Sequence, residues 1–141
     1  MAPWLSTFYI GTDLDTDFQT INDLFNTSQA IDPDATFAPF TAYTDNINGS
    51  RSGVGFPMAT WKWSGKEDIN IGVLQEFWSG ALSVPLYIRT LTNDVDVYGA
   101  RVYRTFLCQA LWPPKDLDMQ AGFTLGLELE FRHCVIQAEA V

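Results

Sequence analysis

Hydrophobic and polar residues alternate most regularly near the C-terminus, between Ala121 and His133. Successive side chains of a strand point to opposite sides of a sheet, so this pattern predicts one long strand. Its buried face would carry the large apolar residues from Phe123 to Phe131. Its solvated face would carry the polar and charged residues and one glycine, namely Thr124, Gly126, Glu128, Glu130 and Arg132.

Five other stretches are rich in β-branched and aromatic residues and predict further strands. They are Trp4–Ile10, Thr36–Thr44, Arg51–Trp63, Val84–Thr92 and Tyr98–Leu111. Gly11 is expected to end the first of them. Asn48 and Gly49 give a strong hairpin-turn signal within residues 45–50, and a second turn is expected over Asn93–Asp96.

Two segments interrupt this series of strands. Ser64–Ser79 predicts a helix, because apolar residues recur at helical spacing from Ile71 to Trp78 and Gly80 can end it. The polar segment Asp13–Asp34 predicts either a short helix or an irregular excursion.

The order of the elements predicts a mainly β fold. Strands precede and follow a single helix, without the alternation of a parallel doubly wound sheet. We therefore expect an antiparallel β-sandwich or a curled antiparallel sheet with one flanking α-helix, as a single domain over residues 1–141. Gly53, Gly55 and Pro57 favour a bulge or a sheet edge at the start of Arg51–Trp63.

The charge of the chain narrows the choice of partners. Seventeen acidic residues against eight basic ones give a formal net charge of -9. Proteins that grip nucleic acid usually present basic surfaces, so direct binding of DNA or RNA is not expected. No stretch approaches the roughly 18–20 apolar residues of a membrane span, and the N-terminal residues lack the pattern of a signal peptide.

Few residues are suited to catalysis or to metal binding. His133 is the single histidine, so a nucleophilic triad would have to use it. Glu128 and Glu130 would lie roughly 6.5–7 Å apart on one strand face, which could suit the acid pair of a glycosidase. Both are expected to be solvated, and we favour a charged stripe over a catalytic pair. No metal or other cofactor is expected.

Tryptophans and cysteines leave alternatives open. Trp61, Trp63 and Trp78 could form a platform that stacks on sugars, although such clusters more often belong to a core or an interface. Cys108 and Cys134 are expected to be small buried residues in neighbouring strands, and a disulfide between them is the alternative.

Several of these stretches, taken in order, resemble small structural proteins of tailed-bacteriophage virions, of the tail-tube and tail-tip kind. The resemblance covers about residues 36–133 and depends on pattern and order. It is carried by Gly53–Trp63, the helix that follows, Leu86–Thr90, Leu111–Pro113 and Leu127–Arg132.

The resemblance implies a tail-tube-like fold whose copies form homohexameric, stacked rings. In that family the inner sheets join into one barrel around a channel that carries DNA, and the channel wall is typically acidic. The lumen-facing residues here would be Glu128, Glu130, Thr124 and Arg132, while Arg101 and Arg104 interrupt the acidic pattern on the neighbouring strand.

The resemblance also implies a loop that reaches the next ring. That inter-ring or inter-subunit loop would be Asp45–Arg51, with Asp45, Asn48, Gly49 and Arg51, or the acidic segment Asp13–Asp34. Other partners would be the tape measure, sheath, tip or neck proteins, and the protein would be assembled in the host cytoplasm and end in the virion.

The sequence therefore predicts a non-enzymatic tail-tube protein. A tail-tip, baseplate or tail-terminator ring is the nearest alternative. A carbohydrate-binding β-sandwich module that uses the tryptophans, and a small hydrolase that uses Glu128 and Glu130, are alternatives from other classes.

Overall fold

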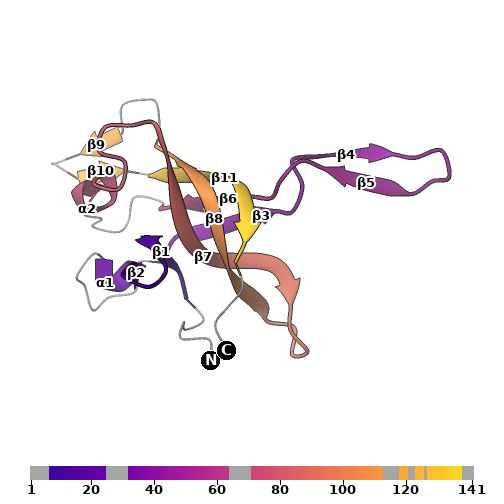
Figure 1. Ribbon diagram of the computed structural model, residues 1–141, viewed down its shortest axis with the longest axis horizontal. Helices are drawn as coiled ribbons and strands as arrows, with labels where there is room; N and C mark the ends of the chain where they lie inside the picture. The colour runs from indigo at the N-terminus through magenta and orange to yellow at the C-terminus, as the bar shows by residue number, and fades with distance from the viewer. Residues whose placement is uncertain are drawn as a thin grey trace.

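A computed structural model describes residues 7–24, 32–63, 71–112, 118–120, 123–125 and 127–137 (Figure 1). The described residues form eleven strands and two short helices. The helices are α1 (Ile21–Leu24) and α2 (Ile71–Gln75). The strands are β1 (Tyr9–Asp13), β2 (Asp17–Thr20), β3 (Asp34–Ala38), β4 (Ala42–Asp45), β5 (Arg51–Val54), β6 (Met58–Lys62), β7 (Ser83–Val95), β8 (Arg101–Leu111), β9 (Asp118–Gln120), β10 (Phe123–Leu125) and β11 (Glu128–Ile136).

One seven-stranded antiparallel sheet dominates the fold, in the order β2-β1-β7-β8-β11-β6-β3. Two small antiparallel pairs, β4 with β5 and β9 with β10, lie outside it. The predicted mainly β, antiparallel fold class is confirmed.

The large sheet curls until its end strand β3 contacts the interior strands β7 and β8. Asn93 on β7 donates a side-chain hydrogen bond to the carbonyl of Phe37 on the edge strand β3, at 2.8 Å. Phe37 also stacks on Phe106 of β8, with ring centroids 5.3 Å apart. Of the two arrangements left open by the sequence, the curled sheet is the one observed.

The core fills the concave side of this sheet. Trp61 is fully buried there, and its indole N–H donates to the Thr90 hydroxyl at 2.9 Å, which joins β6 to β7 across the interior. Near α2, the indole of Trp78 donates to the carbonyl of Ala110 at 3.0 Å. Buried indoles need such partners, so these bonds fix the large rings in single orientations.

The predicted helix is shorter in the structure. Its second half is present as α2, followed by tight turns in which Phe77 and Trp78 donate to carbonyls three residues earlier. Leu74 and Trp78 are buried as expected, and Gly80 ends the turns with a φ of 86°. Residues 64–70 lie outside the described part.

The predicted long C-terminal strand is wrong in its first part. Residues 123–125 form β10, which pairs with β9 in a separate ribbon, and only residues 128–136 form β11 of the large sheet. The sequence predicts a loop over Lys115–Met119, and this is wrong for residues 118–119, which belong to β9. Residues 123–125 could pair either with β9 or, as a continuation of β11, with the large sheet. Tertiary contacts select β9, and the alternation of residues along one strand does not reveal its pairing partner.

The second predicted hairpin turn is displaced along the chain. β7 runs through the expected turn at Asn93–Asp96, and the chain reverses at residues 96–100 instead. The carboxylate of Asp96 accepts backbone N–H bonds from Tyr98 and Ala100, and Gly99 has a φ of 83°. Glycine adopts a positive φ without steric cost, so the turn forms around Gly99 and not at Asn93–Asp96.

β1 continues past Gly11, where the sequence predicts its end. Gly11 pairs with Phe18 of β2, and a Cβ atom at Gly11 would lie 1.7 Å from the carbonyl oxygen of Asp17. The glycine therefore permits a close approach of two strands. Residues 4–6 of the predicted first strand, Trp4–Ile10, lie outside the described residues.

Gly11→Ala should consequently destabilise the protein. The added methyl meets backbone atoms, which cannot move without disturbing the β1–β2 pairing, so we expect a loss of about 2–3 kcal/mol. Urea unfolding followed by circular dichroism measures this loss. Thr16→Ala, an exposed change in the same hairpin, should shift stability by less than about 0.5 kcal/mol. Equal effects from both variants would contradict the close-approach explanation.

Candidate functional site: the projecting hairpin and its root

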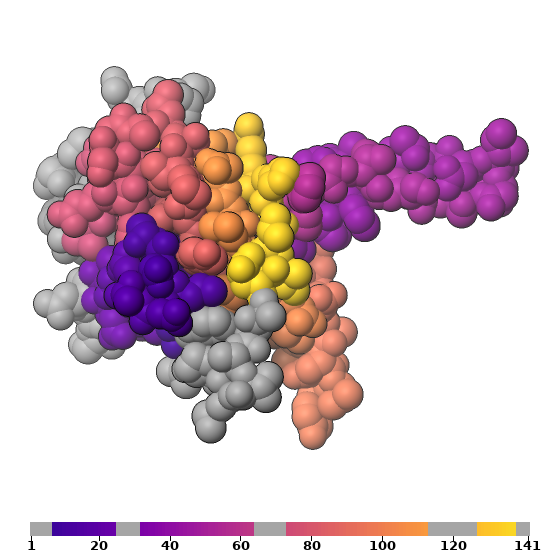
Figure 2. All heavy atoms as spheres, in the orientation of Figure 1, coloured from indigo at the N-terminus to yellow at the C-terminus, as the bar shows by residue number. Residues whose placement is uncertain are grey.

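The β4–β5 hairpin leaves the body of the molecule and projects into solvent. Its strands pair from Ala42 with Val54 to Asp45 with Arg51, and every residue from Pro39 to Phe56 is exposed. Figure 1 shows the hairpin as an isolated ribbon, and Figure 2 shows the same arm standing clear of the other atoms. We call residues 40–56 the arm.

The tip of the arm is a tight turn. The N–H groups of Asn46 and Gly49 donate to the carbonyls of Ser50 and Asn46, and Gly49 has a φ of 86°. The Asn48 side chain accepts the N–H of Ser50 at 3.0 Å. These bonds pair the polar backbone groups of the turn with one another, and the Ile47 side chain stays fully exposed.

Charge and aromatic contacts stiffen the shaft of the arm. Arg51 forms an ion pair with Asp45 at 2.7 Å, and its guanidinium lies 4.1 Å from the ring centroid of Tyr43. An exposed ion pair contributes about 0–1 kcal/mol and an exposed cation–π contact about 0.5–1 kcal/mol. The four predicted loop residues, Asp45, Asn48, Gly49 and Arg51, are thus brought together in one ordered hairpin end.

Two contacts hold the arm together at its root. A Cβ atom on Gly53 would lie 2.3 Å from the Phe40 ring, so the aromatic ring occupies the space that a side chain would need. Thr41 donates its hydroxyl to the carbonyl of Val54 at 3.0 Å. The sequence predicts a bulge or a sheet edge at Gly53, Gly55 and Pro57 within one strand. In the structure the chain leaves one sheet for another there, so the predicted strand Arg51–Trp63 is divided into β5 and β6.

β11 fastens the root to the sheet. The Phe56 and His133 rings stack with centroids 3.6 Å apart, and the Cys134 N–H donates to the Pro57 carbonyl at 3.0 Å. His133 has a φ of 57° and lies where the register of β11 against β8 shifts, between Arg132 and Val135. This β-bulge turns the histidine toward the arm.

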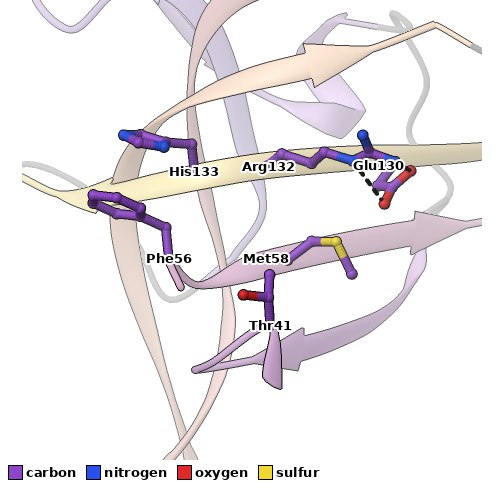
Figure 3. Close-up of a pocket in the computed structure, with 6 residues that line it drawn as sticks. All are labelled: Thr41, Phe56, Met58, Glu130, Arg132 and His133. Atoms are coloured by element: carbon purple, nitrogen blue, oxygen red, sulfur yellow. Dashed lines mark hydrogen bonds and ion pairs between the residues drawn. The ribbon is translucent and has the colours of Figure 1, made fainter. Parts of the chain in front are cut away.

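A shallow hollow of about 430 Å³ opens beside this junction (Figure 3). Glu130 and Arg132 form a bidentate ion pair inside it, with both nitrogen–oxygen distances at 3.1 Å. The hollow combines apolar and charged surface. Its lining residues are Thr41, Phe56, Met58, Glu130, Arg132 and His133.

The predicted lumen-facing residues do not all share one surface. Glu128 and Arg132 are exposed on β11, and Glu130 is half-buried on the same face. Thr124 lies on β10 in the separate ribbon, so its placement on the same strand as these residues is wrong.

The charge of this face is mixed. Lys62 on β6 lies opposite Glu128, and Asp34 on β3 lies on the other side of Lys62. Arg132 binds Glu130, so basic side chains offset much of the acidic stripe. The face of β11 is therefore less negative than the predicted acidic stripe, although the whole chain has a formal net charge of -9.

Arg101 and Arg104 contact the preceding strand instead of the β11 face. Arg104 pairs with Asp94 at 3.0 Å, and Arg101 donates to the carbonyl of Asn93. Both arginines therefore brace the outer half of the β7–β8 hairpin.

The other candidate sites are dispersed or buried. Trp61, Trp63 and Trp78 are at most 1% exposed, so they belong to the core and cannot present a sugar-stacking surface. Among the residues that the structure describes, no three His, Cys, Asp or Glu side chains converge as metal ligands would. In the same residues, no helix has the length and apolar character needed to cross a membrane.

Sequence reasoning missed the contact between Phe56 and His133 and the projection of the arm. Pro39 and Pro57 flank the arm, and proline is uncommon inside central strands, so these two positions are the available signal that the strands are interrupted there. The chain matches no protein-family model, and comparisons with curated proteins and with solved structures gave no match.

Proposed function

We propose that this chain is a non-enzymatic structural protein of a tailed-phage tail, which assembles as homohexameric rings stacked into a tube. The observation that carries the proposal is the arm. It is a long hairpin that stands clear of the core of its own chain and ends in an exposed apolar residue, Ile47.

The arm needs a surface to lie on. A two-stranded hairpin alone is at best marginally stable in water, and packing against another layer is what normally stabilises it. Five large apolar side chains of the arm are between 42% and 109% exposed. Its large exposed apolar residues are Phe40, Tyr43, Ile47, Val54 and Phe56. A neighbouring copy of the chain, in the next ring, would cover them.

The edges of the sheet favour lateral assembly. β2 and β3 are the end strands of the seven-stranded sheet, and such strands offer backbone groups to a strand of another molecule. On β3 the carbonyl of Phe37 already accepts a hydrogen bond from Asn93, so the other backbone groups of this edge would form the pairing. Pairing the β3 edge of one copy with the β2 edge of the next would close a ring and continue the sheet around a channel. The net charge of -9 per copy would keep DNA from adhering to the assembled wall.

A tail-tip, baseplate or terminator ring remains the nearest alternative, because a single ring would use the same sheet edges. In that case the arm would contact a different tail protein. The carbohydrate-binding alternative loses its tryptophan platform to the core. A hydrolase based on Glu128 and Glu130 is disfavoured because the Glu130 carboxylate is already engaged in an ion pair with Arg132.

Electron microscopy and native mass spectrometry of the purified full chain test the proposal. We expect rings of six 15.8 kDa copies with a central hole, and stacked tubes as concentration rises. Isolated rings that never stack would favour the tip or terminator alternative. A chain that stays monomeric at all concentrations up to about 1 mM would contradict the proposal.

A further inference from the structure

The two cysteines of the chain lie against each other beneath the root of the arm. Cys108 on β8 and Cys134 on β11 are 3% and 2% exposed. β8 pairs with β11 so that Arg132 faces Gln109 and Val135 faces Leu107. Cys108 is therefore the one residue of β8 opposite the bulge, which contains His133 and Cys134.

Both side chains are buried between β8 and β11. Interaction with the Cys134 thiol, together with burial, raises the pKa of Cys108 well above its usual range, and interaction with the Cys108 thiol lowers the pKa of Cys134. The Cys108 thiol also donates to the carbonyl of Leu86 at 3.3 Å. Both cysteines are free in the structure.

We propose that Cys108 and Cys134 are an oxidisable pair that closes to a disulfide between β8 and β11 when the protein meets a peroxide. Opposed residues of an antiparallel pair have Cα atoms about 4.5–5.5 Å apart, within the range that a disulfide spans. A small neutral oxidant is required because both thiols are buried. The pairing needs only one copy of the chain, so it is independent of the proposed assembly.

The reaction balances in two steps. The Cys134 thiol first loses its proton, and the thiolate attacks one oxygen of hydrogen peroxide. The O–O bond breaks, and a sulfenic acid and hydroxide form; the hydroxide takes up the proton that Cys134 released and becomes water. The Cys108 sulfur then attacks the Cys134 sulfur. The S–O bond breaks as the S–S bond forms, and the leaving hydroxide takes the Cys108 proton. Two thiols are oxidised and one peroxide is reduced to two waters.

The disulfide would stiffen the sheet where the arm is attached. Cys134 already holds the Pro57 carbonyl through its backbone N–H, and its neighbour His133 stacks on Phe56. A covalent bond from Cys134 to β8 would restrict opening of β11 and the connected root. Cross-links also stabilise a fold by restricting the unfolded chain.

Peroxide treatment of the folded chain, followed by alkylation of free thiols in denaturant and peptide mass mapping, tests the inference. We expect a linked peptide pair containing both cysteines, loss of both free thiols, and complete reversal by dithiothreitol. The melting temperature of the oxidised protein should rise by about 10 °C. Cys108→Ala and Cys134→Ala should form no linked pair and show no rise.

Other products would overturn the inference. Thiols that stay alkylatable after peroxide treatment, or disulfides formed only between separate chains on a non-reducing gel, are incompatible with a built-in pair. Oxidation of Cys134 to a sulfinic acid while Cys108 stays a free thiol would also contradict the inference. These measurements use the unaltered protein, so a variant that fails to fold does not affect the outcome.

Discussion

Replacing Ile47 with aspartate should weaken the proposed stacking of rings into tubes at least tenfold while every copy stays folded. Ile47 is fully exposed at the tip of the arm, and it contributes nothing to the fold of its own chain. Covering an isoleucine side chain contributes about 1.5–3 kcal/mol, and a buried unpaired carboxylate is strongly unfavourable. We therefore expect the concentration needed for tube formation to rise at least tenfold, as about 1.4 kcal/mol per contact implies.

Sedimentation velocity and negative-stain microscopy measure this effect. Val97→Asp is the matched control, because Val97 is an apolar residue 92% exposed at the tip of the β7–β8 hairpin. That variant introduces the same charge at a different projection and should still form tubes. Unchanged tube formation by Ile47→Asp would remove the arm from the assembly, and equal loss in both variants would attribute the effect to charge alone.

The sequence predicted this arm only in part. Asn48 and Gly49 marked the turn correctly, because the local conformation of a tight turn depends on the residues within it. The departure of the hairpin from the sheet depends on the Phe40 ring against Gly53 and on Phe56 against His133. Such contacts join residues that are distant in the chain, and a local pattern does not contain them.

The alternating pattern near the C-terminus was likewise predicted in part. Leu127, Leu129 and Phe131 are buried, as the period-two pattern predicts, because a one-residue shift would move all of them into solvent. The bulge at His133 breaks that period, so Cys134 returns to the core where strict alternation from Phe131 would have placed His133. A non-glycine residue in the left-handed region gives no signal in the sequence.

The mixed charge around Glu128 was also beyond the reach of sequence reasoning. Lys62 faces Glu128 only because β6 and β11 are neighbours in the sheet, although α2 and four strands, β7 to β10, separate them along the chain. Partner strands determine the charge of a surface. An acidic run on one strand therefore indicates a charged face without fixing its net sign.

Trp61→Ala should destabilise the fold more than Gly11→Ala does. Trp61 is fully buried and packs edge-to-face against Phe131 with centroids 4.7 Å apart and against Phe8 at 5.5 Å. Truncating a buried aromatic residue to alanine costs about 3–5 kcal/mol, a large share of the roughly 5–15 kcal/mol that stabilises a typical domain. Urea unfolding followed by far-ultraviolet circular dichroism measures the loss.

A double-mutant cycle separates packing from hydrogen bonding at this position. Trp61→Phe keeps an aromatic ring but leaves the buried Thr90 hydroxyl without its indole partner, which should cost about 1–3 kcal/mol. Thr90→Val removes the hydroxyl. If the 2.9 Å bond is formed in solution, the double variant should be clearly more stable than the sum of the two single effects predicts.

The same tryptophan distinguishes the structural role from sugar binding. Tyr98→Ala, at a side chain 92% exposed, should change stability by less than about 0.5 kcal/mol and serves as the aromatic control. A Trp61→Ala protein that kept its full stability and had lost affinity for a glycan would place the indole on a binding surface. The buried ring and its bond to Thr90 lead us to expect the opposite: a cooperative loss of the fold, because Trp61 joins β6 to β7 across the interior of the curled sheet.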